Sequence, residues 1–91
     1  MYKEELNEYL NKPVVVDTAT SLIYIGTLSQ IGNSFITLKD VDVHDVDEGA
    51  SSKAVYALEA KKHGIRKNRS YTKVRIDVII SISRLEDIIE Y

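Results

Sequence analysis

Short runs of apolar and β-branched residues, separated by polar breaks, make up most of this chain. The clearest runs are residues 22–31 and 35–41, joined by residues 32–34 (Gly-Asn-Ser), which enter turns readily. This pattern predicts two strands connected by a tight turn. Gly26 interrupts the first strand, and a glycine inside a strand indicates a bend or a bulge. A bent strand followed by a hairpin is typical of a short sheet that curls into a small barrel.

Three further strands are predicted around this hairpin. The β-branched run at 14–18 predicts a first strand, and residues 71–76 and 78–83 predict two more with a kink near Asp77. Residues 22–25 are apolar on both phases of the strand alternation, whereas a strand with one buried face should alternate. We therefore expect this strand to be covered on both sides, by the barrel interior and by a helix or a neighbouring subunit.

Two helices are predicted in addition to the five strands. Residues 2–10 place apolar side chains at helical spacing, and the proline at position 13 makes a longer helix unfavourable. A second helix is predicted at about 52–63, with a serine N-cap before it and Gly64 after it. The alternative for residues 54–58 is a continuation of the sheet, because valine and tyrosine are good strand formers.

Composition and charge narrow the class of protein. The chain has 91 residues, of which 44% are hydrophobic and 29% charged, as in ordinary globular domains. Its net charge of −2 offers no overall attraction to nucleic acid, so a site for a polyanion has to be a local patch. There is no cysteine, the first residues lack the apolar run of a signal peptide, and no segment is long enough to span a membrane. We expect a soluble cytoplasmic protein without a membrane partner.

The order of these elements, and two short motifs, resemble the Sm/LSm family, whose bacterial member is the RNA chaperone Hfq. The first motif matches Gly26, Leu28, Ile31 and the apolar strand 35–38, and the second matches Val74-Arg75-Ile76 followed by an apolar final strand. The resemblance implies an all-β fold, a strongly bent five-stranded antiparallel barrel of SH3-like type with an N-terminal helix and a helix inserted between strands three and four. The expected layout is a single domain over 1–91: helix 2–10, strands one to three in 14–43, a long variable loop at 44–69, strands four and five in 70–83, and a tail at 84–91 with one further helical turn.

The same resemblance implies a non-enzymatic function. Family members form rings of six or seven subunits, in which the fourth strand of one protomer pairs with the fifth strand of the next, and they hold single-stranded RNA near the central pore. Gly32, Ile36 and Ile76 depart from the usual motifs, which carry Asp, often Asn, and Gly at these positions. The alternative is an Sm-like oligomeric scaffold that has lost RNA binding and contacts protein partners through residues 44–69.

Four residues are candidates for RNA binding. Arg75, at the predicted kink, can hydrogen-bond or stack on a base, and Lys73 lies two residues before it. Asn33 and Ser34 lie at the hairpin tip, where the family contacts bases. The alternatives are an exposed strand arginine paired with Asp77 or with a partner's carboxylate, and ordinary turn chemistry at the hairpin tip.

A basic run follows the second helix. Seven of the twelve Lys and Arg residues lie between positions 61 and 75, and among them Arg66, Lys67 and Arg69 are possible phosphate contacts. The acidic run at 40–48 is expected to lie close to this basic run if strands three and four pair, so that part of the charge is neutralised.

No other pattern in the chain predicts chemistry. The residues Asp42, His44, Asp45 and Asp47 lack the spacing of a known metal site and indicate an acidic loop. No catalytic nucleophile with a base and an orienting residue is apparent, so we expect neither an enzyme nor a cofactor. Phe35 can stack on a base, but its place in an apolar strand favours the core.

Overall fold

The computed structural model describes residues 2–49 and 51–90, and side chains from residue 4 onward; residue 91 of the predicted tail lies outside them. Five antiparallel strands form one sheet in the order β4-β3-β2-β1-β5. The strands are β1 (Pro13–Thr18), β2 (Leu22–Ile31), β3 (Phe35–Asp45), β4 (Arg69–Arg75) and β5 (Ile79–Arg84). The helices are α1 (Tyr2–Leu6), continued by the 3-10 turn η1 (Asn7–Tyr9), and α2 (Lys53–His63), and two further turns are η2 (Ile76–Val78) and η3 (Leu85–Asp87).

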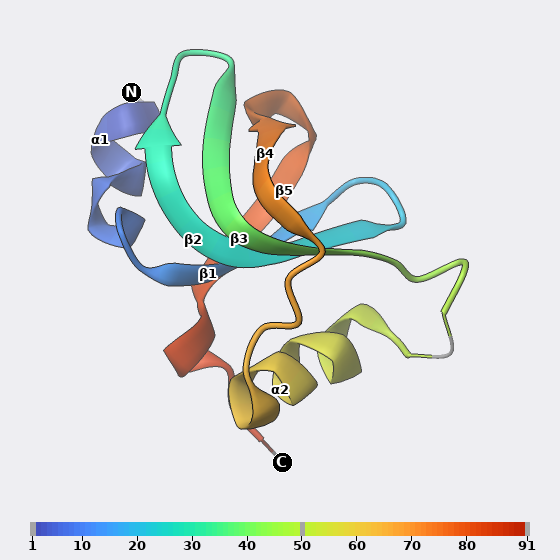
Figure 1. The fold of residues 1–91 in the computed structure, drawn as a ribbon. Helices are drawn as coiled ribbons and strands as arrows, with labels where there is room; N and C mark the ends of the chain where they lie inside the picture. The colour runs from blue at the N-terminus through green and yellow to red at the C-terminus, as the bar shows by residue number, and fades with distance from the viewer. Residues whose placement is uncertain (1, 50, 91) are drawn as a thin grey trace.

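The predicted set of strands and helices is confirmed, and the sheet is strongly curved but not closed (Figure 1). β4 and β5 lie at the two edges and do not pair with each other. β3 is longer than predicted and reaches Asp45, so the connection to β4 begins two residues later than expected. The predicted kink before β5 is confirmed as the 3-10 turn η2.

A bulge lies at Gly26, as predicted. The register between β2 and β3 shifts beside this glycine, and Asp40 on β3 adopts φ 51°. A Cβ atom at position 26 would lie 3.0 Å from the carbonyl oxygen of Lys39 and 3.2 Å from Cα of Val41. Only glycine lets the two backbones approach this closely, so the bulge depends on it.

The concave side of the sheet holds the main core. Its fully or almost fully buried members are Val14, Val16, Leu28, Ile36, Leu38, Val41 and Val74. Three side chains from α1, η1 and the residue that follows pack against this cluster: Leu6, Tyr9 and Leu10. The N-terminal helix therefore covers an opening of the curved sheet, where a short amphipathic helix finds the packing that its own length does not supply (Figure 1).

The opposite, convex side carries a second core over β1 and β2. Val15, Ile23 and Ile25 are buried there against Ala57 and Ala60 of α2. Leu85 and Ile88 of the C-terminal segment complete the cluster. This confirms that β2 is covered on both sides, and the cover on the second side is the inserted helix of the same chain.

Both predicted ends of α2 are confirmed, and the sheet alternative for residues 54–58 is wrong. The Ser52 hydroxyl accepts a hydrogen bond from the Val55 N–H at 3.2 Å. Gly64 follows the helix with φ 90°, and its N–H donates to the carbonyl of Ala60. A cap at each end and two buried alanines favour helix over the local strand propensity.

Lys53, the first residue of α2, ties the helix to the sheet. Its Nζ donates to Asp17 Oδ1 at 2.6 Å and to the carbonyl oxygens of Thr18 and Thr20 at 3.0 and 2.7 Å. At the other end of α2, the Lys61 ammonium donates to the carbonyl of Ile88. These contacts hold the inserted helix and the C-terminal segment on the convex face (Figure 1).

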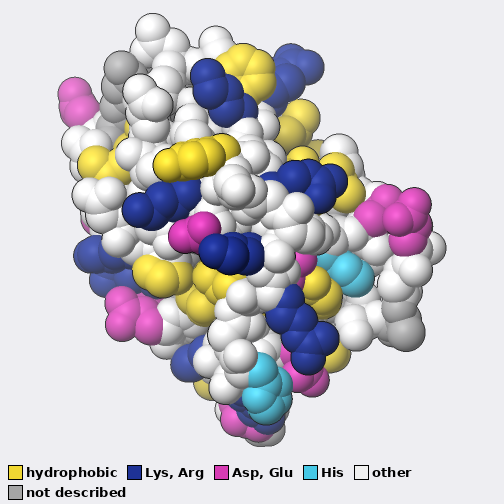
Figure 2. All heavy atoms as spheres, in the orientation of Figure 1, with side chains coloured by type: hydrophobic (Ala, Val, Ile, Leu, Met, Phe, Trp, Pro, Cys, Tyr) yellow, Lys and Arg dark blue, Asp and Glu magenta, His cyan; other side chains and the backbone are white. Residues whose placement is uncertain are grey.

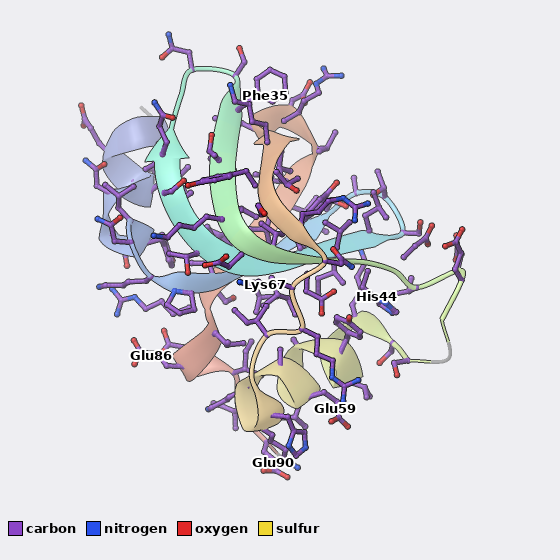
Figure 3. All side chains as sticks on the ribbon, in the orientation of Figure 1. Phe35, His44, Glu59, Lys67, Glu86 and Glu90 are labelled. Atoms are coloured by element: carbon purple, nitrogen blue, oxygen red, sulfur yellow. The ribbon has the colours of Figure 1, made fainter. Side chains whose placement is uncertain are left out.

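Phe35 does not lie in the core, and the prediction that it does is wrong. Ile36 and Leu38 occupy the inward phase of β3 and are fully buried, so Phe35 and Thr37 face the convex side. Phe35 is 42% exposed and projects from the end of β3 beside the hairpin loop (Figure 3). The first side chain of β3 that points into the core is therefore Ile36 and not Phe35.

Candidate nucleic-acid interface

The β2–β3 hairpin presents its tip as a compact polar loop. The Gly32 N–H donates to the carbonyl oxygen of Phe35 at 2.8 Å, which closes the turn. A Cβ atom at Gly32 would lie 3.0 Å from that same oxygen. Asn33 and Ser34 lie between these two residues and are exposed. The loop therefore offers one amide and one hydroxyl group to the solvent from a short, hydrogen-bonded turn.

The turn η2 lies directly beside this loop. Arg75 is the last residue of β4 and is the register partner of Phe35. The following residue, Ile76, donates its N–H to the carbonyl oxygen of Ser34 at 2.8 Å. This hydrogen bond joins two loops that are about 40 residues apart in the sequence, as the numbering of the two residues shows. Pairing of β3 with β4 thus brings Asn33, Ser34 and Arg75 together.

These residues line an open cavity of about 220 Å³, with Ile76 and Asp77 completing its wall. The Arg75 guanidinium donates to Asp77 Oδ2 at 2.5 Å, and both side chains are more than 60% exposed. An exposed ion pair of this kind adds little to stability, but it restricts the orientation of the guanidinium plane. The ion-paired alternative for Arg75 is therefore realised within the chain, and the pair lies inside the cavity.

The chemistry of this cavity, hereafter the loop site (Asn33, Ser34, Arg75, Ile76, Asp77), suits an unpaired nucleotide. An amide, a hydroxyl and a guanidinium provide donors and acceptors for the edge of a base or for a phosphate. A guanidinium plane is also a surface on which a base stacks. The sequence pointed to Asp77 only as an ion-pair partner of Arg75, and the structure adds it to the wall of the cavity.

The other predicted RNA contacts lie outside the loop site. Lys73 lies two residues before Arg75 on the same exposed side of β4. Lys67 pairs with Asp40 at 3.3 Å, which is one contact between the basic and acidic runs of the kind that we expected. Arg69, at the start of β4, donates to the carbonyl oxygen of Asn68. The structure thus brings three of the four main candidates into one cavity and places the three phosphate candidates at and just before the start of β4, at the other end of that strand.

Arg66 lines a different cavity, of about 290 Å³, between α2 and β3. Tyr56 of α2 donates its hydroxyl to Asp42 Oδ2 at 2.5 Å, and its ring stacks on His44 with centroids 3.8 Å apart. Burial, followed by the hydrogen bond to Asp42, raises the pKa of Tyr56 to about 12. Asp42 is only 3% exposed and also accepts from Asn68, so both of its oxygens have partners.

This second cavity therefore belongs to the contact that anchors α2 (Figure 3).

Over residues 2–49 and 51–90, no group of three or more acidic or histidine side chains lies close enough together to hold a metal ion. In the predicted acidic loop, the Asp45 carboxylate accepts a hydrogen bond from the Asp47 N–H at 3.0 Å. The hydrogen bonds of Asp45 with Ser21 and Asp47 lower its pKa. Within the same described residues, no helix is long and apolar enough to cross a membrane.

Comparison with solved structures identifies the fold. The chain superposes on the structure of the Pyrococcus abyssii Sm protein in complex with a uridine heptamer with a TM-score of 0.60 and 17% sequence identity, over 89% of this chain and 93% of that one. It also superposes on a chain of the NatC complex bound to CoA with a TM-score of 0.55 and 17% identity, over 85% of this chain and 79% of that one. No protein-family model matches the sequence, and comparison with curated proteins finds no match. The chain therefore has an Sm-like fold, which agrees with the resemblance of its sequence motifs.

Proposed function

We propose that this Sm-like chain is a non-enzymatic RNA-binding protein that holds single-stranded RNA at the loop site. The observation that carries the proposal is the cavity formed jointly by Asn33 and Ser34 of the hairpin loop and Arg75 at the end of β4. The Sm protein with the similar fold was solved with a uridine heptamer, which supports RNA as the ligand class. Lys73 is proposed to assist at the loop site, with Arg66, Lys67 and Arg69 as outer phosphate contacts.

Arg75 is proposed to contact the base directly. In the free protein, its guanidinium is held by Asp77 on the wall of the cavity, where a base can stack on its outer face without breaking the pair. The hairpin amide and hydroxyl of Asn33 and Ser34 then reach the edge of the base or the phosphate. Stacking on such a surface contributes about 1–3 kcal/mol per base, so removal of Arg75 should weaken binding about tenfold or more.

The test is the affinity of fluorescein-labelled oligo-U and oligo-A RNA, measured by anisotropy for the native protein and Arg75→Ala. Lys62→Ala is the matched control, because it also removes one positive charge. Lys62 pairs with Glu90 near the end of α2 and does not line the loop site. The proposal requires RNA affinity that Arg75→Ala reduces and Lys62→Ala leaves nearly unchanged. Absence of binding at low salt, or equal affinities for both variants, would refute it.

We also propose that the chain forms a ring by pairing β4 of one copy with β5 of the next. Both strands are edges of the open sheet, and unpaired edges are normally covered. Beside β5 lies an apolar cavity of about 360 Å³ lined mainly by isoleucines, and Ile80 is 64% exposed. Sedimentation or light scattering at micromolar concentration tests this: a monomer would exclude the ring. Ile80→Lys should shift the native oligomer toward monomer, because a charge then enters the interface.

A second candidate function is a scaffold for protein partners. The observation that favours it is the structural match to a chain in the NatC complex, which places a similar fold inside a protein assembly. Ile36 of this chain also favours the scaffold. It is fully buried in the core, and it stands at the position where many family members use Asn to read a base. Residues 44–69, with the acidic turn and α2, would then be the partner surface. A stable ring that binds no RNA at low salt would favour the scaffold over the first proposal.

A further inference from the structure

The convex side of the sheet is divided into two unlike halves. Over β1 and β2 it is apolar and covered by α2 and the C-terminal segment. Over residues 35–39 of β3 and 71–75 of β4, the convex side is not covered by a helix (Figure 1). Six side chains form this bare half, hereafter the β3–β4 outer face: Phe35, Thr37, Lys39, Tyr71, Lys73 and Arg75.

The strand register places these six side chains in three facing pairs. Phe35 is opposite Arg75, Thr37 is opposite Lys73, and Lys39 is opposite Tyr71. Residues directly opposite each other in an antiparallel pair lie on the same face, and alternate residues of each strand share that face. The intervening residues Ile36, Leu38 and Val74 point into the core, which confirms the orientation of the other phase.

None of the six side chains of this face is acidic and three of them are basic; the exposed Asp40, next to Lys39 in the sequence, pairs with Lys67 at 3.3 Å. Lys39 and Lys73 are exposed and make no ion pair with any residue that the structure describes. Arg75 contacts an acid only at the border of the face, through the pair with Asp77. In Figure 2, dark blue Lys and Arg side chains lie among yellow apolar side chains across the front of the molecule, and magenta acidic side chains lie beside some of them. The chain as a whole has a net charge of −2, so the positive charge of this face is local and can attract a polyanion only there.

Two aromatic rings are exposed among these cations. Tyr71 is 67% exposed and Phe35 is 42% exposed, and the structure gives neither side chain a hydrogen bond or a ring partner among its described residues. Lys39, the register partner of Tyr71, lies four residues after Phe35, a separation of about 14 Å along the strand. Exposed rings spaced between unpaired cations form the arrangement that binds single-stranded nucleic acid by stacking and phosphate contact.

We infer that the β3–β4 outer face is a second binding surface that continues the loop site and takes the adjoining nucleotides of the same single strand. The two surfaces share Arg75 and meet at Phe35, so a strand that leaves the loop site enters this face directly. Lys39 and Lys73 contact phosphates, and Tyr71 and Phe35 stack on bases. This inference rests on the proposed RNA-binding function, and it adds residues to which that function assigns no role, namely Phe35, Lys39 and Tyr71.

Ring formation is compatible with this surface. Pairing of β4 with the β5 of another copy would use the backbone groups at the strand edge, which lie in the plane of the sheet. Side chains of β4 stand roughly perpendicular to that plane, so the outer face stays accessible.

The test compares a uridine dinucleotide, which the loop site alone can hold, with oligo-U of about 12 nucleotides, which also reaches the outer face. The variants are Tyr71→Thr, which keeps strand propensity, and Lys39→Gln, with Lys62→Gln as the charge-matched control. Tyr71→Thr should weaken binding of the longer RNA about tenfold and leave the shorter RNA unchanged. Lys39→Gln should lower the salt slope for the longer RNA by about 0.7, the value of one phosphate contact on a single strand.

Each outcome separates this inference from the proposed function. If Tyr71→Thr and Lys39→Gln behave like Lys62→Gln toward the longer RNA, the outer face is not a binding surface, even if a ring gives the longer RNA higher affinity. If poly-aspartate displaces the longer RNA as well as unlabelled oligo-U does, and Tyr71→Thr has no effect, the face recognises charge alone and the inference is overturned. Loss of binding of the shorter RNA in Arg75→Ala tests the loop site independently. Circular dichroism of each variant verifies that the fold is retained.

Discussion

The contact between Tyr56 and Asp42 allows the attachment of α2 to be measured. The Tyr56→Phe substitution removes the hydroxyl that donates to Asp42 Oδ2 at 2.5 Å and keeps the ring that stacks on His44. It leaves a carboxylate that is 3% exposed with one donor fewer. A hydrogen bond to a charged group contributes about 1.5–3 kcal/mol, and because Tyr56 is partly exposed we expect the lower end, about 1.5 kcal/mol. For a chain of this size that corresponds to a fall in Tm of about 6–12 °C.

The pH dependence of this loss provides a second, independent reading. Burial and the hydrogen bond to Asp42 raise the pKa of Tyr56 to about 12 in the folded state, against 10.0 in the reference state. The stabilisation is therefore complete below pH 10 and is lost as the pH rises toward 12, because the unfolded phenol ionises first. By about pH 11 the native protein should lose about 1 kcal/mol from this group alone, and the difference from Tyr56→Phe should shrink by the same amount.

Urea denaturation of both proteins at pH 8 and at about pH 11 measures this difference. Tyr71→Phe is the control, since Tyr71 is 67% exposed and its hydroxyl donates to no residue that the structure describes. It should change the free energy of unfolding by less than about 0.5 kcal/mol at either pH. A Tyr56→Phe variant as stable as the native protein at pH 8, or a stability difference that does not change with pH, would show that this hydrogen bond does not hold α2 in place.

Two further predictions concern the bend of the sheet and the start of α2. Gly26→Ala should destabilise the fold by about 1–3 kcal/mol, because the new Cβ lies 3.0 Å from the carbonyl oxygen of Lys39 and 3.2 Å from Cα of Val41; thermal denaturation measures the loss. Lys53→Met should lower stability by about 1–2 kcal/mol, since it leaves Asp17 and two carbonyl oxygens without their shared donor, and α2 should gain faster amide hydrogen exchange than the sheet does.

Each of these substitutions has an internal comparison. Gly64→Ala meets no atom within 4 Å but strains a backbone at φ 90° and ψ 167°, a region open almost only to glycine, so its cost of about 1–3 kcal/mol comes from backbone strain and not from a clash. Lys67→Met removes an exposed pair with Asp40 and should change stability by less than about 1 kcal/mol. Equal losses for Lys53→Met and Lys67→Met would contradict the role assigned to Lys53, and a Gly26→Ala variant as stable as the native protein would contradict the role assigned to Gly26.

The sequence by itself determined the local elements. Runs of β-branched residues separated by Gly, Asn and Ser define the strands and the hairpin, because strand and turn propensities act over a few residues. Gly26 predicted the bulge, and Ser52 and Gly64 predicted the ends of α2, since each of these depends on a neighbouring backbone group. The candidates Asn33, Ser34 and Arg75 also came from the motifs, and the structure brings them together.

Only the tertiary structure decided which phase of each strand faces the core and what covers the other phase. Ile36 rather than Phe35 points inward, because the inward phase of β3 is set by pairing with β2 and β4 and not by the apolar run alone. The two apolar phases of residues 22–25 predicted cover on both sides, but only packing shows that α2 of the same chain supplies it. The convex half over β3 and β4 is left bare for the same reason, since one short helix covers only two strands. The buried contact of Tyr56 with Asp42 likewise depends on side-chain geometry, which spacing along the sequence does not define, whereas the pair of Arg75 with Asp77 was one of the alternatives that the sequence offered.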